Sequence, residues 1–161
     1  MLLEPPRIYE STVDHAVGTY RQMVMTTWRC RVTPEAVLSV RRRSEASFAS
    51  DAKGIVFLVV VEESAQSPSK DARQSLAELL RAHSEQIAGG AMIFEGSGFR
   101  AAAVRSVATS MAILARTEYA FKVFPSVENA AIWLGPLSGN VLAPDEIVEA
   151  ARAIRNARLT G

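Results

Sequence analysis

The sequence predicts a mixed α/β fold: a mostly parallel sheet of four to five strands that starts with a β-hairpin, is packed by helices and is followed by a C-terminal helix. The first observation is residues 55–61, Ile-Val-Phe-Leu-Val-Val-Val, a continuous apolar run of strand length. Such a run without alternation is typical of a strand that is covered on both faces. The second observation is that, after residue 33, segments of helical periodicity alternate with short apolar segments. Helical crossovers of this kind join parallel strands.

The N-terminal segment, residues 8–28, is rich in β-branched and aromatic residues and predicts two extended strands around Val17-Gly18. Simple alternation in the second strand places its aromatic residues on one face and its methionines on the other. These side chains are large for a sheet edge, and methionine with aromatic residues is common at adaptable interfaces. We therefore predict that one face of the hairpin contacts a partner, through residues drawn from Tyr20, Met23, Met25 and Trp28.

The segment Thr33-Pro34-Glu35 predicts a helix start, because it supplies an N-cap, a proline at the first helical position and an acid in the first turn. This helix should end near residue 50. After the central strand, a second helix is expected to end at Gly89-Gly90. The later elements are expected as a strand at 91–94, an alanine-rich helix at 99–117, a strand at 121–124 and a short helix at 126–134. The helix at 99–117 should be buried through Ala103, Val107, Met111 and Leu114.

Pro144 opens the last predicted helix, at about residues 144–159. Its residues Ile147, Ala150, Ala151 and Ile154 form an apolar stripe that needs a surface to pack on. We interpret residues 1–161 as a single domain, with a core at about 8–134 to which this helix is added.

The composition excludes several classes of function. Lys and Arg number 18 and Asp and Glu 17, so the net charge of +1 supplies no general attraction to nucleic acid or to an anionic membrane. The single cysteine, Cys30, excludes an internal disulfide and a cysteine-based metal cluster. The N-terminus lacks the pattern of a secretory signal, and the longest apolar run is too short to span a bilayer. We therefore expect a cytoplasmic protein, and we predict neither a metal nor a cofactor.

The order of the predicted elements and the closing segment at residues 121–134, FKVFPSVENAAIWL, resemble the STAS superfamily, whose best-known members are bacterial anti-sigma-factor antagonists. The resemblance covers about residues 8–134 and implies a STAS-like regulatory module. In that family, the loop after the central strand carries an Asp-Ser/Thr-Gly pattern whose hydroxyl is phosphorylated by a partner kinase. The corresponding residues, 62–71, lack this pattern but offer two serines, with Asp71 beside them. Ser69 is the first candidate because it could cap the following helix, and Ser67 is the second.

A glycine-rich turn at residues 95–100 joins a predicted strand to a predicted helix. Such a turn can present backbone N–H groups to an anion at a helix N-terminus. The candidate contacts to an anion or an acidic partner are Gly96, Gly98, Arg100 and Arg105. The turn lacks the full dinucleotide fingerprint and the P-loop lysine, so a tight connection is the simpler interpretation.

Three hypotheses of function follow, and none of them assigns a catalytic residue. The leading one is a non-enzymatic regulatory or scaffold module that binds another protein or a second copy of this chain. The first alternative is a carrier of a small molecule or lipid-like ligand, which an apolar cavity would indicate. The second alternative is an enzyme acting on a phosphorylated substrate at a rim formed by Glu62, Glu63 and residues 96–100, because α/β sheets place ligands at the carboxyl ends of their strands. Glu95 ends the neighbouring strand in the same way, so we expect it to share this rim.

Overall fold

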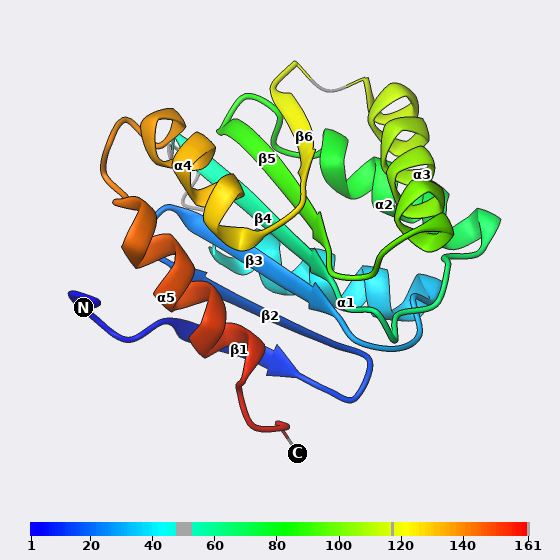
Figure 1. Ribbon diagram of the computed structural model, residues 1–161, viewed down its shortest axis with the longest axis horizontal. Coiled ribbons are helices and arrows are strands. Elements are labelled where there is room, and N and C mark those ends of the chain that lie inside the picture. The colour runs from blue at the N-terminus through cyan, green and yellow to red at the C-terminus, as the bar shows by residue number, and fades with distance from the viewer. Residues whose placement is uncertain (48–52, 117, 161) are drawn as a thin grey trace.

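The computed structural model describes residues 1–47, 53–116 and 118–160, which form one mixed sheet with helices on both faces (Figure 1). The strands are β1 Arg7–Ser11, β2 His15–Tyr20, β3 Met23–Trp28, β4 Ile55–Val61, β5 Ile87–Phe94 and β6 Ala120–Phe124. The helices are α1 Pro34–Ser47, α2 Lys70–Arg81, α3 Phe99–Ala115, α4 Val127–Leu137 and α5 Pro144–Arg155. Strand order follows chain order, with β1 to β3 antiparallel and β3 to β6 parallel. The expected fold class is confirmed, with six strands in the described ranges instead of four to five.

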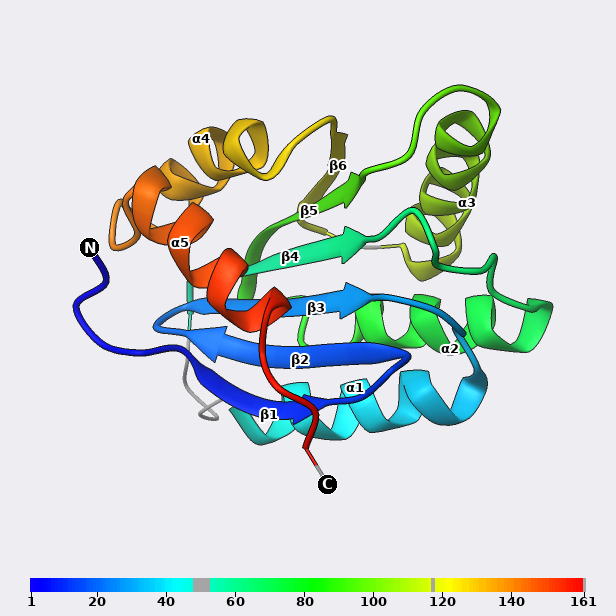
Figure 2. The same cartoon turned by 60° about the horizontal axis from the view of Figure 1, so that its bottom comes forward.

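The connections between the parallel strands decide which helices share a face. All three crossovers advance in the same direction along the sheet, and right-handed crossovers of this kind place their helices on one side. Helices α1, α2 and α3 accordingly lie together on one face (Figure 2). Helices α4 and α5 follow the last strand and cover the opposite face. Strand β4 lies between these layers, which explains its unbroken apolar run.

The N-terminal turn lies at Arg21-Gln22 and not at Val17-Gly18, so the predicted hairpin is a three-stranded meander. Arg21 adopts a φ of 50°, and Tyr20 pairs with Met23 across this tight turn. Gly18 lies in the middle of β2, where a Cβ atom would approach the carbonyl oxygen of Arg7 to 2.7 Å. This glycine therefore marks a close approach of neighbouring chain segments and not a turn.

The four residues predicted as a partner-binding face are all buried. Tyr20 is 1% exposed, Met23 and Met25 are 0% exposed, and Trp28 is 4% exposed. The prediction that the aromatic residues share one face of the strand is also wrong, because residues paired across the Arg21-Gln22 turn lie on the same side of the sheet. Tyr20 therefore packs with Met23 and Met25 beneath α5, whereas Trp28 packs beneath α1. Helices α1 and α5 cover the two faces of the meander. A partner could therefore contact these four side chains only if the core opened.

Helix α2 ends at Arg81, and strand β5 begins four residues earlier than predicted. Gly89 and Gly90 do not stop the helix but lie within β5. A Cβ atom on Gly89 would lie 2.6 Å from Leu137 Cδ1 of α4, and one on Gly90 would lie 2.7 Å from Phe121. The two glycines therefore let neighbouring side chains pack directly on the backbone of the strand.

Helix α5 packs on its own sheet through the predicted stripe, in which no residue is more than 2% exposed. It ends at Arg155 and not near residue 159, because the following tail pairs with β1. Thr160 N donates to Ser11 O at 2.8 Å, and Ser11 N donates to Thr160 Oγ1 at 3.0 Å. The tail thereby satisfies backbone groups that the edge strand would otherwise expose.

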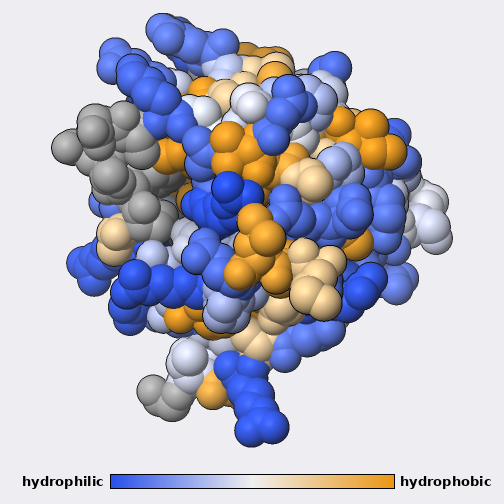
Figure 3. All heavy atoms as spheres, turned by 90° about the vertical axis from the view of Figure 1, so that its left-hand side faces the viewer, coloured by the Kyte–Doolittle hydropathy of each residue, from blue (hydrophilic) through white to orange (hydrophobic). Residues whose placement is uncertain are grey.

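The surface on the side of α4 and α5 carries several small hydrophobic areas separated by hydrophilic side chains (Figure 3). The exposed apolar residues of the molecule include Leu3 and Ile132, at 76% and 65% exposure. Single exposed apolar side chains are ordinary on a protein surface. These side chains do not by themselves mark a binding surface.

Candidate functional site

The two faces of the central strand β4 are covered unequally. On the side of α4 and α5, Val56, Leu58 and Val60 are 0% exposed. On the opposite side, Ile55 and Phe57 are buried, but Val59 and Val61 are only half-buried. A central strand of a parallel sheet is normally covered on both faces along its length. The carboxyl half of β4 therefore faces open space beneath α2 and α3.

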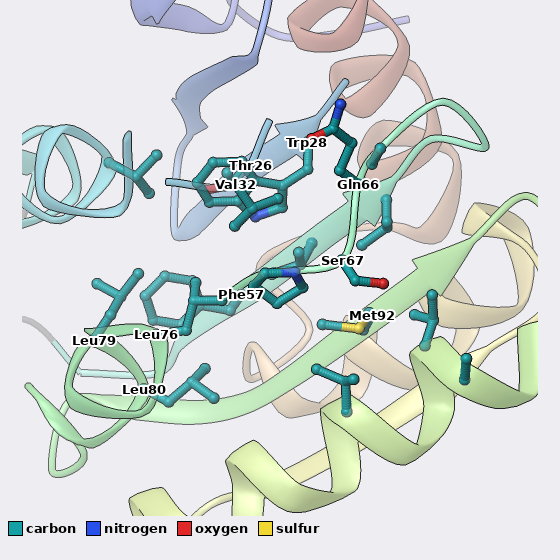
Figure 4. Close-up of a pocket in the computed structure, with 18 of the residues that line it drawn as sticks. Thr26, Trp28, Val32, Phe57, Gln66, Ser67, Leu76, Leu79, Leu80 and Met92 are labelled. Atoms are coloured by element: carbon teal, nitrogen blue, oxygen red, sulfur yellow. The ribbon is translucent and has the colours of Figure 1, made fainter. Parts of the chain in front are cut away.

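That space is a cavity of about 280 Å³ between the sheet and α1, α2 and α3 (Figure 4). Its floor is formed by strand residues Thr26, Trp28, Phe57, Val59, Val61, Met92 and Phe121. Its walls are formed by Val32, Val40, Leu76, Leu79, Leu80, Ala103, Val104 and Val107, and its mouth by Ala65, Gln66, Ser67, Pro68 and Arg100. The lining is almost wholly apolar, and its described residues include no His, Cys, Asp or Glu.

Among the described residues of α3, those that face the sheet have short side chains. They are Val104, Val107 and Ala108, which belong to an apolar cluster with Leu80 of α2 and Met92 of β5. Ala103 was expected in the buried stripe but is exposed on the wall of the cavity. The side chains of Met111 and Leu114, expected in the same stripe, lie outside the described part of the chain. The cavity is roughly twice the ~150 Å³ of an engineered apolar cavity that stays dry and binds benzene. It is therefore large enough for an organic molecule of roughly a dozen non-hydrogen atoms.

The mouth of the cavity lies at the carboxyl ends of β4 and β5, where α2 and α3 begin. Ser69 caps α2 by accepting a hydrogen bond from Ala72 N at 3.1 Å. Arg100, in the first turn of α3, donates from Nη2 to Ala65 O at 2.7 Å and so ties this helix to the loop that follows β4. This edge of an open α/β sheet is where such folds bind ligands.

The structure separates the predicted site residues into two groups. Ser67 and Arg100, predicted for different roles, both line the cavity. The other predicted residues near the mouth are the exposed Ser69 and Asp71 at the start of α2, with Gly96 and Gly98 in the turn before α3. Arg105 is exposed farther along α3 and does not line the cavity.

Two predicted rim carboxylates meet on the opposite side of the sheet edge. Arg155 of α5 donates from Nε to Glu62 Oε1 at 3.2 Å and from Nη1 to Glu95 Oε2 at 2.6 Å, while its Nη2 contacts Glu95 Oε1. Partial burial lowers the pKa of Arg155, but the hydrogen bonds to Glu95 and Glu62 outweigh it and raise the pKa overall. The sequence placed both acids on one rim but missed Arg155, whose only signal was the spacing of arginines along the last helix.

The histidines take structural positions away from the cavity. His15 is 4% exposed, and its Nε2 lies 2.6 Å from Glu10 Oε1, which also accepts a hydrogen bond from Ser39 Oγ at 2.6 Å. His83 Nδ1 lies 2.9 Å from Gln86 Oε1. Within the described ranges, no group of three His, Cys, Asp or Glu side chains is placed to hold a metal ion.

Comparison with known proteins identifies the fold. No protein-family model matches the sequence, and no curated protein does. Among solved structures, the chain is similar to an uncharacterized protein of the DUF3478 family with a SpoIIAA-like fold from Shewanella loihica PV-4. The two share 18% sequence identity with a TM-score of 0.56, over 83% of this chain and 98% of the other. No helix in the described ranges is long and apolar enough to cross a membrane. The chain therefore has a SpoIIAA-like fold, as the STAS resemblance of residues 8–134 implied.

Proposed function

We propose that this chain is a binding module that takes up a small apolar molecule between its sheet and helices α1 to α3. The observation that carries the proposal is the apolar cavity of about 280 Å³ beneath α2 and α3. Of the hypotheses from sequence, the ligand carrier is the one that such a cavity indicates. The lining residues support binding over chemistry, because among those described the polar ones are Thr26, Gln66, Ser67 and Arg100, without an acid or base pair.

The cavity can supply useful affinity. A ligand the size of one large aromatic side chain buries about 200 Å² of apolar surface. At about 25 cal/mol per Å², this burial contributes about 5 kcal/mol before the loss of ligand freedom is subtracted. A pre-formed apolar site with a polar opening is also the usual arrangement of small-molecule sites.

The first test uses the intrinsic fluorescence of Trp28, which lines the cavity. The second tryptophan, Trp133, packs against Phe124 on the other side of the sheet, so the Trp133→Phe variant leaves Trp28 as the reporter. Titration with decan-1-ol, a neutral probe of suitable size, should give a saturable change with one site per chain. The absence of any saturable change in the folded protein would falsify the proposal.

A cavity-filling variant distinguishes the cavity from other apolar surfaces. Val59→Phe places an aromatic ring on the cavity floor and should abolish the saturable change. The matched control is Val13→Phe, because Val13 is 61% exposed in the loop between β1 and β2. This control should bind decan-1-ol like the parent protein, whereas equal loss in both variants would speak against the cavity as the site.

As a second candidate function, we infer that a regulatory protein partner contacts the loop at residues 66–71. Two observations favour it: Ser67, Ser69 and Asp71 are exposed there, and Gln66 and Ser67 also line the mouth of the cavity. A partner on this loop would sense whether the cavity is occupied. The test is quantitative affinity capture from the source cell with the parent chain and the Ser67→Arg variant. A stoichiometric protein lost only in the variant supports this candidate, and equal capture by both contradicts it.

A further inference from the structure

The polar residues at the opening make the cavity amphipathic. The loop after β4 contributes Gln66 and Ser67, and the first turn of α3 contributes Arg100. The opposite end is closed by apolar side chains, including Leu79, Leu80 and Phe57 (Figure 4). A molecule that fills this space meets a hydrocarbon surface at one end and hydrogen-bonding groups at the other.

Arg100 is the charged residue among the described residues that line the cavity. A guanidinium group carries five N–H donors. The hydrogen bond from Nη2 to Ala65 O uses one of them and holds the group across the opening. No carboxylate of the described residues forms an ion pair with Arg100, in contrast to Arg155, whose charge is paired with Glu62 and Glu95. The positive charge at the mouth therefore remains available to a ligand.

Two further features favour an anion at this position. Helices α2 and α3 both begin at this edge of the sheet, and helix N-termini carry partial positive charge. The forked guanidinium of arginine matches a carboxylate in two parallel hydrogen bonds, which an ammonium group cannot reproduce. The acids closest in sequence to the mouth are Glu62, Glu63, Glu95 and Asp71. Glu62 and Glu95 are tied to Arg155, whereas Glu63 and Asp71 are exposed.

We propose that the ligand is an anionic amphiphile: a monocarboxylate whose apolar tail of roughly eight to twelve non-hydrogen atoms fills the cavity and whose carboxylate binds Arg100 at the mouth. This inference rests on the proposed function and names the ligand class for the same site. Burial of the apolar tail contributes to affinity for any ligand of this length, and the ion pair with Arg100 favours a ligand that carries a negative charge. A neutral ligand of the same length gains only the burial, and a cationic one is repelled by the arginine.

The test compares three probes of equal tail length, decanoate, decan-1-ol and decylamine, by Trp28 fluorescence in the Trp133→Phe background at pH 8 and low salt. We expect decanoate to bind about tenfold more tightly than decan-1-ol, the increment of one charge-assisted hydrogen-bonded contact. Decylamine should bind more weakly than either. Added salt should weaken the binding of decanoate and leave that of decan-1-ol unchanged, because only the first includes a partly exposed ion pair.

Substitutions at Arg100 test whether this residue causes the preference for decanoate over decan-1-ol. Arg100→Gln should lose about tenfold in decanoate affinity while decan-1-ol binding is retained, and Arg100→Lys should retain part of the preference. The matched control is Arg105→Gln, which removes the same charge from an exposed position on α3 that does not line the cavity. Retained decan-1-ol binding also shows that the Arg100 variants are folded.

The outcomes separate this inference from the function on which it rests. Equal affinity for decanoate and decan-1-ol overturns the carboxylate preference and leaves the apolar cavity as a binding site. A preference for decanoate that survives Arg100→Gln, or that is lost equally in Arg105→Gln, overturns the role of Arg100. Failure of all three probes to bind the folded protein overturns the proposed function itself.

Discussion

Glu10 illustrates how one partly buried carboxylate organises its surroundings. Its Oε1 accepts hydrogen bonds from Ser39 and His15, and Arg43 Nε lies 3.6 Å from its Oε2. Burial by itself raises the pKa of this carboxyl, but the bonds from Ser39 and His15 outweigh it and hold the pKa below its usual value of 4.5. The group therefore connects β1, β2 and α1 in its ionised form.

This lowered pKa predicts a pH-dependent contribution to stability. Because the folded-state pKa lies below the unfolded value, the stabilisation is fully present above about pH 4.5 and is lost as the pH falls through the folded pKa. Glu10→Gln should lower the free energy of unfolding by about 1–2 kcal/mol at pH 7 and by less near pH 3. Urea unfolding of both proteins between pH 3 and 7 measures this difference.

Glu85→Gln serves as the control, since Glu85 is exposed and forms no ion pair with the described residues. Its difference from the parent protein should stay small across the same pH range. A constant difference between Glu10→Gln and the parent at every pH would show that the carboxylate is not held in its charged form.

At the scale of single elements, the residue that caps α2 stabilises a helix that forms part of the cavity wall. Ser69 satisfies the N–H of Ala72, one of the groups that a helix leaves unpaired at its first turn. Helix α2 in turn supplies Leu76, Leu79 and Leu80 to the cavity wall. The residue proposed from sequence as a phosphorylation candidate thus has a structural role whatever modification it receives.

We predict that Ser69→Ala lowers the free energy of unfolding by about 1 kcal/mol, as the loss of an N-cap usually does. Ser69→Asp should retain the stability of the parent, because aspartate is an equally good cap. Thermal unfolding followed by circular dichroism compares the two, with the exposed Ser67→Ala as the control. If the alanine and aspartate variants melt alike, the hydroxyl of Ser69 does not cap the helix in solution.

Several elements were predictable because their signals are local. The N-cap Ser69, the stripe of α5 and the central strand are each encoded in a few neighbouring residues, and the structure has all three. The first turn was not predictable, because Gly18 can mark either a turn or a close contact between chain segments. The same ambiguity explains why the predicted end of α2 was wrong, because Gly89 and Gly90 belong to β5 and do not terminate the helix.

Across the whole molecule, α5 is the part that closes the fold. Its stripe covers β2 and β3, Arg155 links it to the ends of β4 and β5, and Arg29 Nη2 donates to Arg155 O at 2.8 Å at its C-terminus. A cation near the last carbonyl groups of a helix also interacts favourably with the helix dipole. The helix is therefore part of the core of this sheet and not an appendage on it.

We predict that Ile154→Ala, at a position that is 0% exposed, lowers the free energy of unfolding by about 2–5 kcal/mol, because it leaves a cavity beneath α5. Leu159→Ala is the control, since Leu159 is 60% exposed and its truncation should change stability by less than about 0.5 kcal/mol. Equilibrium unfolding in urea measures both. Equal stability of the two variants would mean that α5 does not cover its own sheet in solution.

The sequence by itself determined the class of the fold, the order of most elements and the apolar face of the last helix, because periodicity and capping residues act over a few neighbouring positions. It also placed Glu62 and Glu95 on one edge, since parallel strands end together. Only the tertiary structure decided that Arg155 pairs with these acids, that the meander is buried and that the helices leave a cavity over β4. These properties depend on distances between segments far apart in the chain. A cavity is the difference between the available space and the volume of the side chains, and no local pattern records that difference.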